Sequence, residues 1–235
     1  MHRADSLRYV LAAPLVAPQR GVPAHLERSM STITSTAELR ELYGAPGERA
    51  VRKQLAGLEK HSKLFIAKSP FLLLATNGPA GADCSPKGDA PGFVEVLDDH
   101  TLAIPDRRGN SRIDSLENLI ENPEIGLLFM IPGADDTLRV NGRASLSTDP
   151  ELLSRFEVGG ALPKVVILVS VEQVYLHCAK ALIRSRLWAP ESQIDRKSMP
   201  TFSRMLHEQI SQQPDEAEIT AAEADYDARN QRTLY

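Results

Sequence analysis

The sequence is poor in the residues that mark several specialised classes of protein. Its 235 residues include two cysteines, one tryptophan and 5% aromatic residues. No apolar run approaches the roughly 18 residues that are needed to cross a bilayer. Cys84 and Cys178 form no CxxC pair and are too few for a disulfide framework or a zinc site. A basic excess is also missing, since 27 Lys and Arg face 31 Asp and Glu. These absences argue against membrane-spanning, disulfide-stapled and nucleic-acid-binding proteins, and a reducing cytoplasm is the expected compartment.

The short motifs of the best-known nucleotide-binding and hydrolytic sites are missing as well. The chain has no GxGxxG segment, no P-loop, no HExxH pair and no Ser-His-Asp order. Strand-like and helix-like segments do not alternate, which disfavours a parallel nucleotide-binding sheet. Any chemistry must therefore come from residues that the fold brings together.

The first 29 residues differ in composition from the rest of the chain. They contain four Arg, no Lys, two acidic residues and three prolines. Pro14 interrupts the apolar stretch of residues 9–17, whereas a signal peptide requires an uninterrupted one. We expect residues 1–29 to be a disordered leader, or codons translated ahead of a true start at Met30.

Several segments after Met30 have the alternating or fully apolar pattern of strands. We expect strands at 71–77, 82–87, 93–97, 101–104, 124–131, 137–146 and 164–176. Helical periodicity predicts helices at 37–43, 50–67, 112–121 and after Asp149-Pro150. Clustered strands with short turns favour a mainly β (α+β) fold, an antiparallel barrel with peripheral helices. Residues 30–210 would form this domain, and residues 211–235 a helical tail.

The most informative stretch is Ile-Pro-Asp-Arg-Arg-Gly-Asn-Ser-Arg at residues 104–112, between a predicted strand and a predicted helix. Unpaired backbone N–H groups and the dipole at a helix N-terminus attract phosphate. The stretch also offers a glycine that permits close approach, two hydrogen-bonding side chains and three arginines: Gly109, Asn110, Ser111, Arg107, Arg108 and Arg112. Local chemistry equally allows a solvated basic loop in which Asn110 or Ser111 merely caps the helix.

Three further groups of polar residues stand out. Ser85 and Lys87 lie at the end of a predicted strand and, taken alone, indicate only a turn. The polar face of strand 137–146 carries Arg139, Asn141 and Arg143, which would meet solvent, a ligand or a second subunit. The stretch 177–188 holds His177, Cys178 and Trp188, of which the histidine is more often structural than a ligand. Cys178 has no adjacent base to activate it, and Trp188 is an interface anchor or a lid over a planar ring.

Taken in order, these segments resemble a known family. The succession of residues 83–89 (Asp-Cys-Ser-Pro-Lys-Gly-Asp), 104–112, 122–129 and 138–144 resembles the pyridoxamine 5′-phosphate oxidase-like flavoproteins. The Arg-Arg-Gly-Asn loop and the His-Cys-Ala-Lys-Ala stretch at 177–181 resemble a branch of FMN-dependent enzymes within that superfamily. The resemblance extends from about Ala37 to Ile210.

The resemblance implies a split β-barrel homodimer with two FMN molecules at the subunit interface. It assigns the FMN phosphate to Ser85, Lys87, Arg108, Asn110, Ser111 and Arg112. It places the backbone of Ile104, Pro105 and Asp106 beside the isoalloxazine, and it gives Thr137 and Arg139 ring-edge or cross-subunit contacts. One departure limits what carries over. The family's substrate motif Trp-Arg-Leu-His-x-Arg is absent, because Trp188 is followed by Ala189-Pro190. The cofactor therefore follows from the resemblance, but the vitamin substrate does not.

We expect an FMN-dependent oxidoreductase that acts on a small molecule, forms a homodimer and binds neither nucleic acid nor membrane. The flavin would carry the redox chemistry, so no residue is required as an acid or base. Lys180, Arg184 and His177 are the first candidates to test. Three alternatives stay open: a non-enzymatic flavin-binding module, a haem-binding split barrel with His177 or Cys178 as axial ligand, and a deazaflavin coenzyme in place of FMN.

Overall fold

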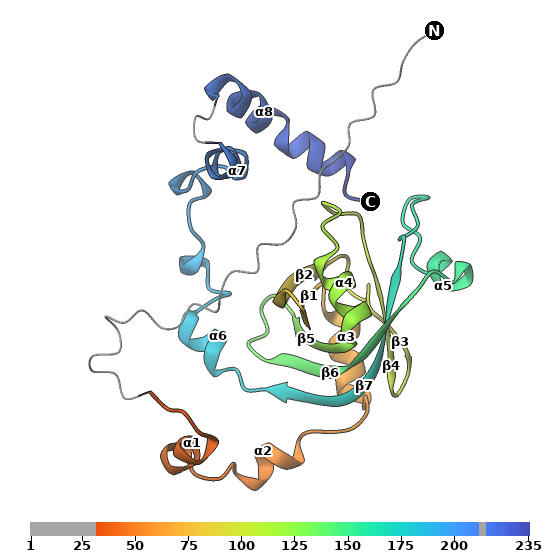
Figure 1. Cartoon of the computed structure of the whole chain (residues 1–235), viewed down its shortest axis with the longest axis vertical. Helices are drawn as coiled ribbons and strands as arrows, with labels where there is room; N and C mark the ends of the chain where they lie inside the picture. The colour runs from red at the N-terminus through yellow and green to blue at the C-terminus, as the bar shows by residue number, and fades with distance from the viewer. Residues whose placement is uncertain (1–31, 212–214) are drawn as a thin grey trace. The chain divides into compact units, whose positions relative to one another are not determined.

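The computed structural model describes residues 32–211 and 215–235, so the expected leader at 1–29 lies outside the described residues. The chain divides into two compact units, residues 1–47 and 48–235. In the first unit the described element is helix α1, Thr36–Tyr43, which confirms the helix expected at 37–43. The second unit contains all seven strands and the remaining helices (Figure 1).

The seven strands form one antiparallel sheet in the order β2-β1-β5-β6-β7-β4-β3. Their bounds are β1 Phe71–Gly78, β2 Gly81–Gly88, β3 Glu95–Asp98, β4 Thr101–Pro105, β5 Glu124–Met130, β6 Thr137–Ser147 and β7 Val166–His177. Within the described residues no ladder joins the edge strands β2 and β3, so the barrel is split rather than closed. The predicted fold class, a mainly β (α+β) antiparallel split barrel with peripheral helices, is confirmed.

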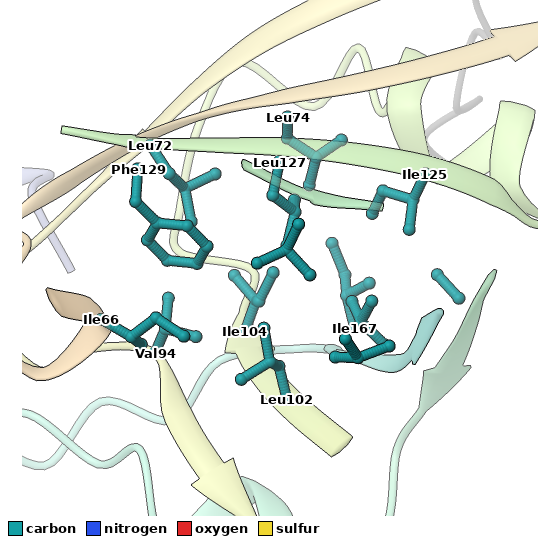
Figure 2. Close-up of a cluster of buried hydrophobic side chains, with 14 of the residues drawn as sticks. Ile66, Leu72, Leu74, Val94, Leu102, Ile104, Ile125, Leu127, Phe129 and Ile167 are labelled. Carbon is teal, nitrogen blue, oxygen red and sulfur yellow. The ribbon is translucent and has the colours of Figure 1, made fainter. Parts of the chain in front are cut away.

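One face of the sheet supplies a single large core. Alternate residues of the strands are almost completely buried there, as Figure 2 shows for Leu72, Leu74, Leu102, Ile104, Ile125, Leu127, Phe129 and Ile167. The alternation follows from the period of two along a strand, which places every second side chain on the same face. The opposite positions of β6, among them Arg139, Asn141 and Arg143, are consequently left outside the core.

Helix α4, Asp114–Glu121, lies between β4 and β5 in the chain and packs against β1. The close approach depends on Gly78, because a Cβ there would lie 2.0 Å from the side-chain oxygen of Asn118. The buried Asn118 amide in turn donates a 3.1 Å hydrogen bond to the Thr76 hydroxyl. The expected helix at 112–121 therefore exists, although it begins at Asp114, and Asn118 holds it against the end of β1.

The single helix predicted at 50–67 is wrong. The structure has two short helices instead, α2 Glu48–Arg52 and α3 Lys60–Lys68. Between them Leu55 exchanges two 2.9 Å backbone hydrogen bonds with Val174 of β7, and the Leu58 N–H donates to the carbonyl of Asp99. Backbone hydrogen bonds to the barrel thus replace the intrahelical hydrogen bonds that a continuous helix would have made. The local sequence pattern does not predict this pairing.

The region after β7 is helical. It contains α6 Lys180–Ser185, two short 3₁₀ helices at Pro190–Ser192 and Arg196–Ser198, α7 Phe202–Ile210 and α8 Glu216–Arg232. The short helix expected after Asp149 is α5, Pro150–Ser154, with the Asp149 side chain as its N-cap. The remaining predicted elements are present within two or three residues at each end.

Candidate ligand-binding site

A cavity of about 1050 Å³ opens at the end of the barrel where β4 stops and α4 starts. It is lined by the end of β2, the loop between β4 and α4, the first turn of α4, residues 161–164 before β7, and Tyr235. The antiparallel pairing of β4 with β7 brings two of these segments together. Pro105 is the partner of Val166, and the Asp106 N–H donates a 2.9 Å hydrogen bond to the carbonyl of Val165.

Three of the five cations that line the cavity are held by carboxylates. The Arg107 Nε lies 2.7 Å from an Asp89 oxygen in a pair whose side chains are only 17% and 5% exposed. The Lys87 Nζ lies 2.6 Å from Asp106. The Arg112 Nε lies 2.8 Å from Asp114, but both of these side chains are far more exposed. Arg107 also donates to the carbonyl of Phe156, so its guanidinium is fixed as part of the wall.

The other two cations, Arg108 and Lys164, are free. Within the described chain neither side chain makes a hydrogen bond or an ion pair, and both are exposed at the cavity. A cation without a partner in a concave site is positioned to attract an anion. Neighbouring arginines in the sequence therefore differ in what they do: Arg107 braces the loop, and Arg108 faces the cavity with its charge uncompensated.

The N-terminus of α4 adds backbone donors to this site. Its N-cap, Ile113, makes no side-chain capping hydrogen bond and has a left-handed backbone with φ of 52°. Ser111, two residues earlier, also has a positive φ of 61°. A left-handed conformation costs a non-glycine residue roughly 1–2 kcal/mol, and more is expected for the β-branched Ile113. Such strain at an uncapped helix start next to free cations is typical of a built anion site.

A cluster of two hydroxyls and one carboxylate lies beside the same helix start. The Ser85 and Ser115 hydroxyls are 2.8 Å apart, and both donate to one oxygen of Asp83. The hydrogen bond from Ser115 is the main reason that the pKa of Asp83 lies below its ordinary value; burial opposes the shift, and Ser85 adds to it. Ser85 is therefore engaged with Asp83, and its hydroxyl must exchange a partner before it can donate to a ligand.

The structure brings most of the residues predicted from the sequence to this cavity. Eight of them line it: Ser85, Lys87, Pro105, Asp106, Arg108, Asn110, Ser111 and Arg112. Ile104 does not line it, because its side chain is completely buried in the core. Thr137 and Arg139 do not line it either, since they lie on β6. Gly109 lines it, and nothing lies within 4 Å of the place where a Cβ would stand.

Thr137 and Arg139 lie on β6 beside the last residues of β7, where Thr137 is the ladder partner of His177. There Arg139 donates to the Tyr175 hydroxyl at 3.1 Å, and Lys53 donates to the carbonyl of Leu176 at 2.7 Å. Both cations lie over the Tyr175 ring, whose centroid is 5.2 Å from that of His177. We call Lys53, Arg139, Tyr175 and His177 the β7-end cluster.

His177 is the unusual member of the β7-end cluster. Its Nε2 is buried without a hydrogen-bond partner in the described structure. Burial, followed by the charges of Arg139 and Lys53, lowers the pKa of His177 below 6.5, so the ring is neutral at neutral pH. Neither His177 nor the other two catalytic candidates, Lys180 and Arg184, lines the cavity.

Sequence reasoning missed several residues that shape the cavity, among them Lys164, Tyr235, Asp89 and Asp83. Lys164 was included in a predicted strand, but β7 begins at Val166 and leaves it in the wall. Asp83 and Asp89 flank the two residues that were predicted, and the alternation of β2 could have indicated that they share a face with Ser85 and Lys87. Tyr235 has no such signal, because it is more than 100 residues from every other segment of the wall except residues 161–164.

Two kinds of site are not found in the described parts of the chain. No helix there combines the length and apolarity that crossing a bilayer requires. Among the same residues, no three or more His, Cys, Asp or Glu side chains gather in a way that could hold a metal ion.

Comparison with known proteins gives one match that covers half of the chain. The sequence model for pyridoxamine 5′-phosphate oxidase matches residues 58–178, which include all seven strands and most of the cavity wall. No curated protein matches the chain.

Solved structures with similar backbones are more distant. A HupZ protein of Group A Streptococcus has 21% identity and a TM-score of 0.42 over 51% of this chain and 98% of its own. General stress protein 26 of Bacillus anthracis has 18% identity and a TM-score of 0.38 over 48% and 88%. A protein named F420 reductase has 16% identity and a TM-score of 0.37 over 51% and 98%.

Proposed function

The chain belongs to the pyridoxamine 5′-phosphate oxidase family, and from this premise we propose that it is an FMN-dependent oxidoreductase whose flavin phosphate binds in the cavity at the start of α4. The proposed substrate is a small molecule. The observation that supports the proposal best is the charge balance of the cavity. Three of its cations are compensated, whereas Arg108 and Lys164 are not.

The donor set fits a phosphate monoester. A phosphate monoester carries a charge of about −1.5 to −2 at neutral pH and offers three strong acceptor oxygens, as phosphoserine does. Two free cations match that charge, and the uncapped N-terminus of α4 supplies backbone donors. The cavity volume of about 1050 Å³ lies just above the range of roughly 300–1,000 Å³ typical of small-molecule sites, so the space is sufficient for a cofactor.

Each residue of the wall has a distinct task in this proposal. Arg108 and Lys164 would bind the phosphate, and the side chains of Asn110 and Ser111 would add hydrogen-bond donors. The pairs Arg107–Asp89 and Lys87–Asp106 would hold the loop so that Arg108 keeps its direction. Gly109 would leave room beside the loop for the ligand. When bound, FMN supplies hydride transfer, and the protein supplies binding, orientation and exclusion of water.

We further propose that the functional unit is a homodimer. Thr137 and Arg139, which the family resemblance assigns to the flavin ring or to the second subunit, do not line the cavity of their own chain. They would reach a flavin only from the neighbouring subunit. A cytoplasmic location agrees with the two cysteines, Cys84 and Cys178, which are exposed and not bonded to each other.

The haem-binding alternative finds less support at this cavity. Of the residue types that serve as axial ligands, the described lining includes Tyr235 but no His, Cys or Met. The Tyr235 hydroxyl already donates to Asp89. His177 and Cys178, the axial candidates from the sequence, are outside the lining.

The absorption spectrum of the purified protein tests the proposal. A flavin spectrum, with FMN identified by chromatography after denaturation, is the expected result. A Soret band would identify a haem protein, and a deazaflavin in the denatured extract would replace FMN in the same cavity. If purified protein shows none of these bands and does not take up added FMN, the proposed function is wrong.

A further inference from the structure

Tyr235 contacts the cavity wall from a segment that is distant in sequence. Its hydroxyl donates a 2.7 Å hydrogen bond to an oxygen of Asp89. Its ring centroid lies 5.5 Å from the guanidinium carbon of Arg107, which is within the range of a cation–π contact. One tyrosine thus contacts both members of the most buried ion pair in the wall.

Asp89 is well suited to hold this tyrosine. The carboxylate side chain is 5% exposed and also accepts hydrogen bonds from Arg107 and from the Ala90 N–H. Burial alone would raise the pKa of Asp89, but the hydrogen bonds from Tyr235, Ala90 and Arg107 outweigh it and lower the pKa. The carboxylate therefore stays ionised at neutral pH, and the contact with Tyr235 is a hydrogen bond to a charged acceptor, which is the stronger kind.

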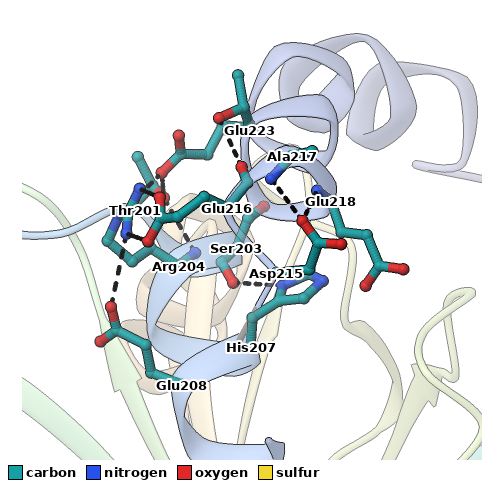
Figure 3. A network of polar contacts seen from close by, with 11 residues as sticks. Thr201, Ser203, Arg204, His207, Glu208, Asp215, Glu216, Ala217, Glu218 and Glu223 are labelled. Carbon is teal, nitrogen blue, oxygen red and sulfur yellow. Dashed lines mark hydrogen bonds and ion pairs between the residues drawn. The ribbon is translucent and has the colours of Figure 1, made fainter. Parts of the chain in front are cut away.

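The segment that carries Tyr235 is itself held at its other end. Tyr235 follows α8, and the start of α8 is bound to α7 by Arg204, which makes two hydrogen bonds to Glu216 and lies 3.6 Å from both Glu208 and Glu223 (Figure 3). Thr201 adds a 2.6 Å hydrogen bond to Glu223. These contacts join α7 and α8 as a helix pair, and the contact of Tyr235 with Asp89 and Arg107 ties the end of that pair to the cavity wall.

The contact does not exclude a ligand. The cavity measures about 1050 Å³ with Tyr235 bonded to Asp89, which already exceeds what a small-molecule site commonly needs. Tyr235 is therefore part of the wall of a cavity with room for a ligand, rather than a plug that must leave before the ligand can bind. Its side chain lines the cavity and is also exposed to solvent.

We propose that Tyr235 is a latch of the ligand site: its contact with Asp89 and Arg107 closes the cavity over the bound ligand and must open for the ligand to enter or leave. The proposal rests on the proposed function, since FMN is taken as the ligand. Because the contact is compatible with both the empty and the filled cavity, opening is required in both directions. Breaking the contact should therefore speed association and dissociation together and leave the equilibrium affinity nearly unchanged.

Two variants and one control test the latch. Tyr235→Phe removes the hydrogen bond and keeps the ring beside Arg107, whereas Tyr235→Ala removes both contacts. Tyr226→Phe is the control, because Tyr226 lies on α8, the helix that precedes Tyr235, with its ring against Phe202 and outside the cavity lining. Stopped-flow flavin fluorescence gives the FMN association and dissociation rates. Hydrogen–deuterium exchange of residues 229–235 without FMN reports the contact itself.

We expect Tyr235→Phe to raise both rates by about fivefold and Tyr235→Ala by more, as the loss of one hydrogen bond to a carboxylate suggests. The dissociation constant should change by less than about twofold, since affinity does not depend on a barrier common to both directions. Exchange at 229–235 should be faster in both Tyr235 variants, and Tyr226→Phe should match the wild type throughout.

Three results would overturn the latch. Unchanged rates in both Tyr235 variants would show that nothing is gated. A weaker affinity with an unchanged association rate would make Tyr235 a direct ligand contact. Equal exchange at 229–235 in all proteins would show that the contact does not hold the segment. If FMN does not bind to the wild type at all, the proposed function fails, and the exchange measurement alone then decides whether the Tyr235 contact holds residues 229–235 against the cavity wall.

Discussion

The cavity and the β7-end cluster each contain cations without a carboxylate partner, and yet only one of them has the shape of a site. In the cavity, Arg108 and Lys164 face an open space of about 1050 Å³. In the β7-end cluster, Lys53 and Arg139 lie over the ring of Tyr175 and donate to neutral oxygens. Neither of these two cations makes an ion pair within the described residues.

The difference teaches that charge alone does not define a ligand site. Around the cavity, buried ion pairs and a strained helix start fix the wall, and the free cations project from it. In the β7-end cluster the cations pack on an aromatic ring, and partial burial together with their charges lowers the pKa of His177. The cavity can therefore bind an anion from solvent. The cations of the β7-end cluster instead have their contacts within the chain or with a second subunit.

The largest expected effect concerns the ion pair that braces the cavity wall. Asp89→Asn leaves the Arg107 guanidinium, whose side chain is mostly buried, without a charged partner, so the free energy of unfolding should fall by about 3 kcal/mol. Asp114→Asn removes the partner of the exposed Arg112 and should leave the stability unchanged within error. Urea denaturation of both variants measures this. Equal losses would show that the Arg107–Asp89 pair is not the brace of the wall.

The next effect separates two arginines of the same loop. Arg108→Ala should weaken FMN binding by about 10- to 100-fold, the range for a hydrogen bond to a charged group, and leave riboflavin binding unchanged. Arg112→Ala should change FMN affinity much less, because Arg112 is engaged with Asp114 and is 73% exposed. Isothermal titration calorimetry with both ligands measures the difference. A larger effect of Arg112 than of Arg108 would reverse the assignment of free and paired cations.

A smaller effect is expected at Gly109. Nothing occupies the space beside its Cα, so Gly109→Ala should leave stability within about 1 kcal/mol of the wild type. The added methyl group would intrude on a ligand next to the loop, and FMN affinity should fall by about fivefold. Gly47→Ala, at another glycine with open space around it, is the control and should change neither property. Unchanged FMN affinity in Gly109→Ala would place the ligand away from the loop.

The smallest effect belongs to the β7-end cluster. Because the folded-state pKa of His177 lies below 6.5, the unfolded chain binds a proton that the native state does not. The contribution of His177 is therefore present above pH 6.5 and is lost as the pH falls below that value. Wild-type stability should decrease in this range more than that of His177→Gln, as thermal denaturation across pH 5–8 would measure. Parallel pH profiles would mean that the imidazole is not held neutral by burial and by the charges of Arg139 and Lys53.

The sequence predicted the parts of the fold that local patterns control. Alternation located the strands, and the change of period after residue 112 located α4, because burial on one face follows directly from the geometry of each element. The helix expected at 50–67 failed because Leu55 pairs with Val174, a contact across more than 100 residues. The periodicity of the 18 residues at 50–67 contains no information about a partner that lies so far away in the sequence.

The site residues also fall into those that local sequence predicts and those that only the fold brings together. Eight of the predicted residues line the cavity because they belong to two continuous stretches, the end of β2 and the loop before α4. Lys164 and Tyr235 join them only through the pairing of β4 with β7 and the hydrogen bond to Asp89. Which cations are free also depends on distances between carboxylates and cations that local sequence does not specify. Arg107 and Arg108 are adjacent and chemically identical, and the fold alone gives them different roles.

The affinity of the wild type for FMN relative to riboflavin tests the central claim most directly. The two ligands differ only in the phosphate, so the ratio of their dissociation constants isolates what Arg108, Lys164 and the start of α4 contribute. Two charge-assisted contacts predict that FMN binds at least about 100-fold more tightly, with an advantage that shrinks as salt is added. Equal affinities for FMN and riboflavin would contradict the account, because the free cations of the cavity would then have no phosphate to hold.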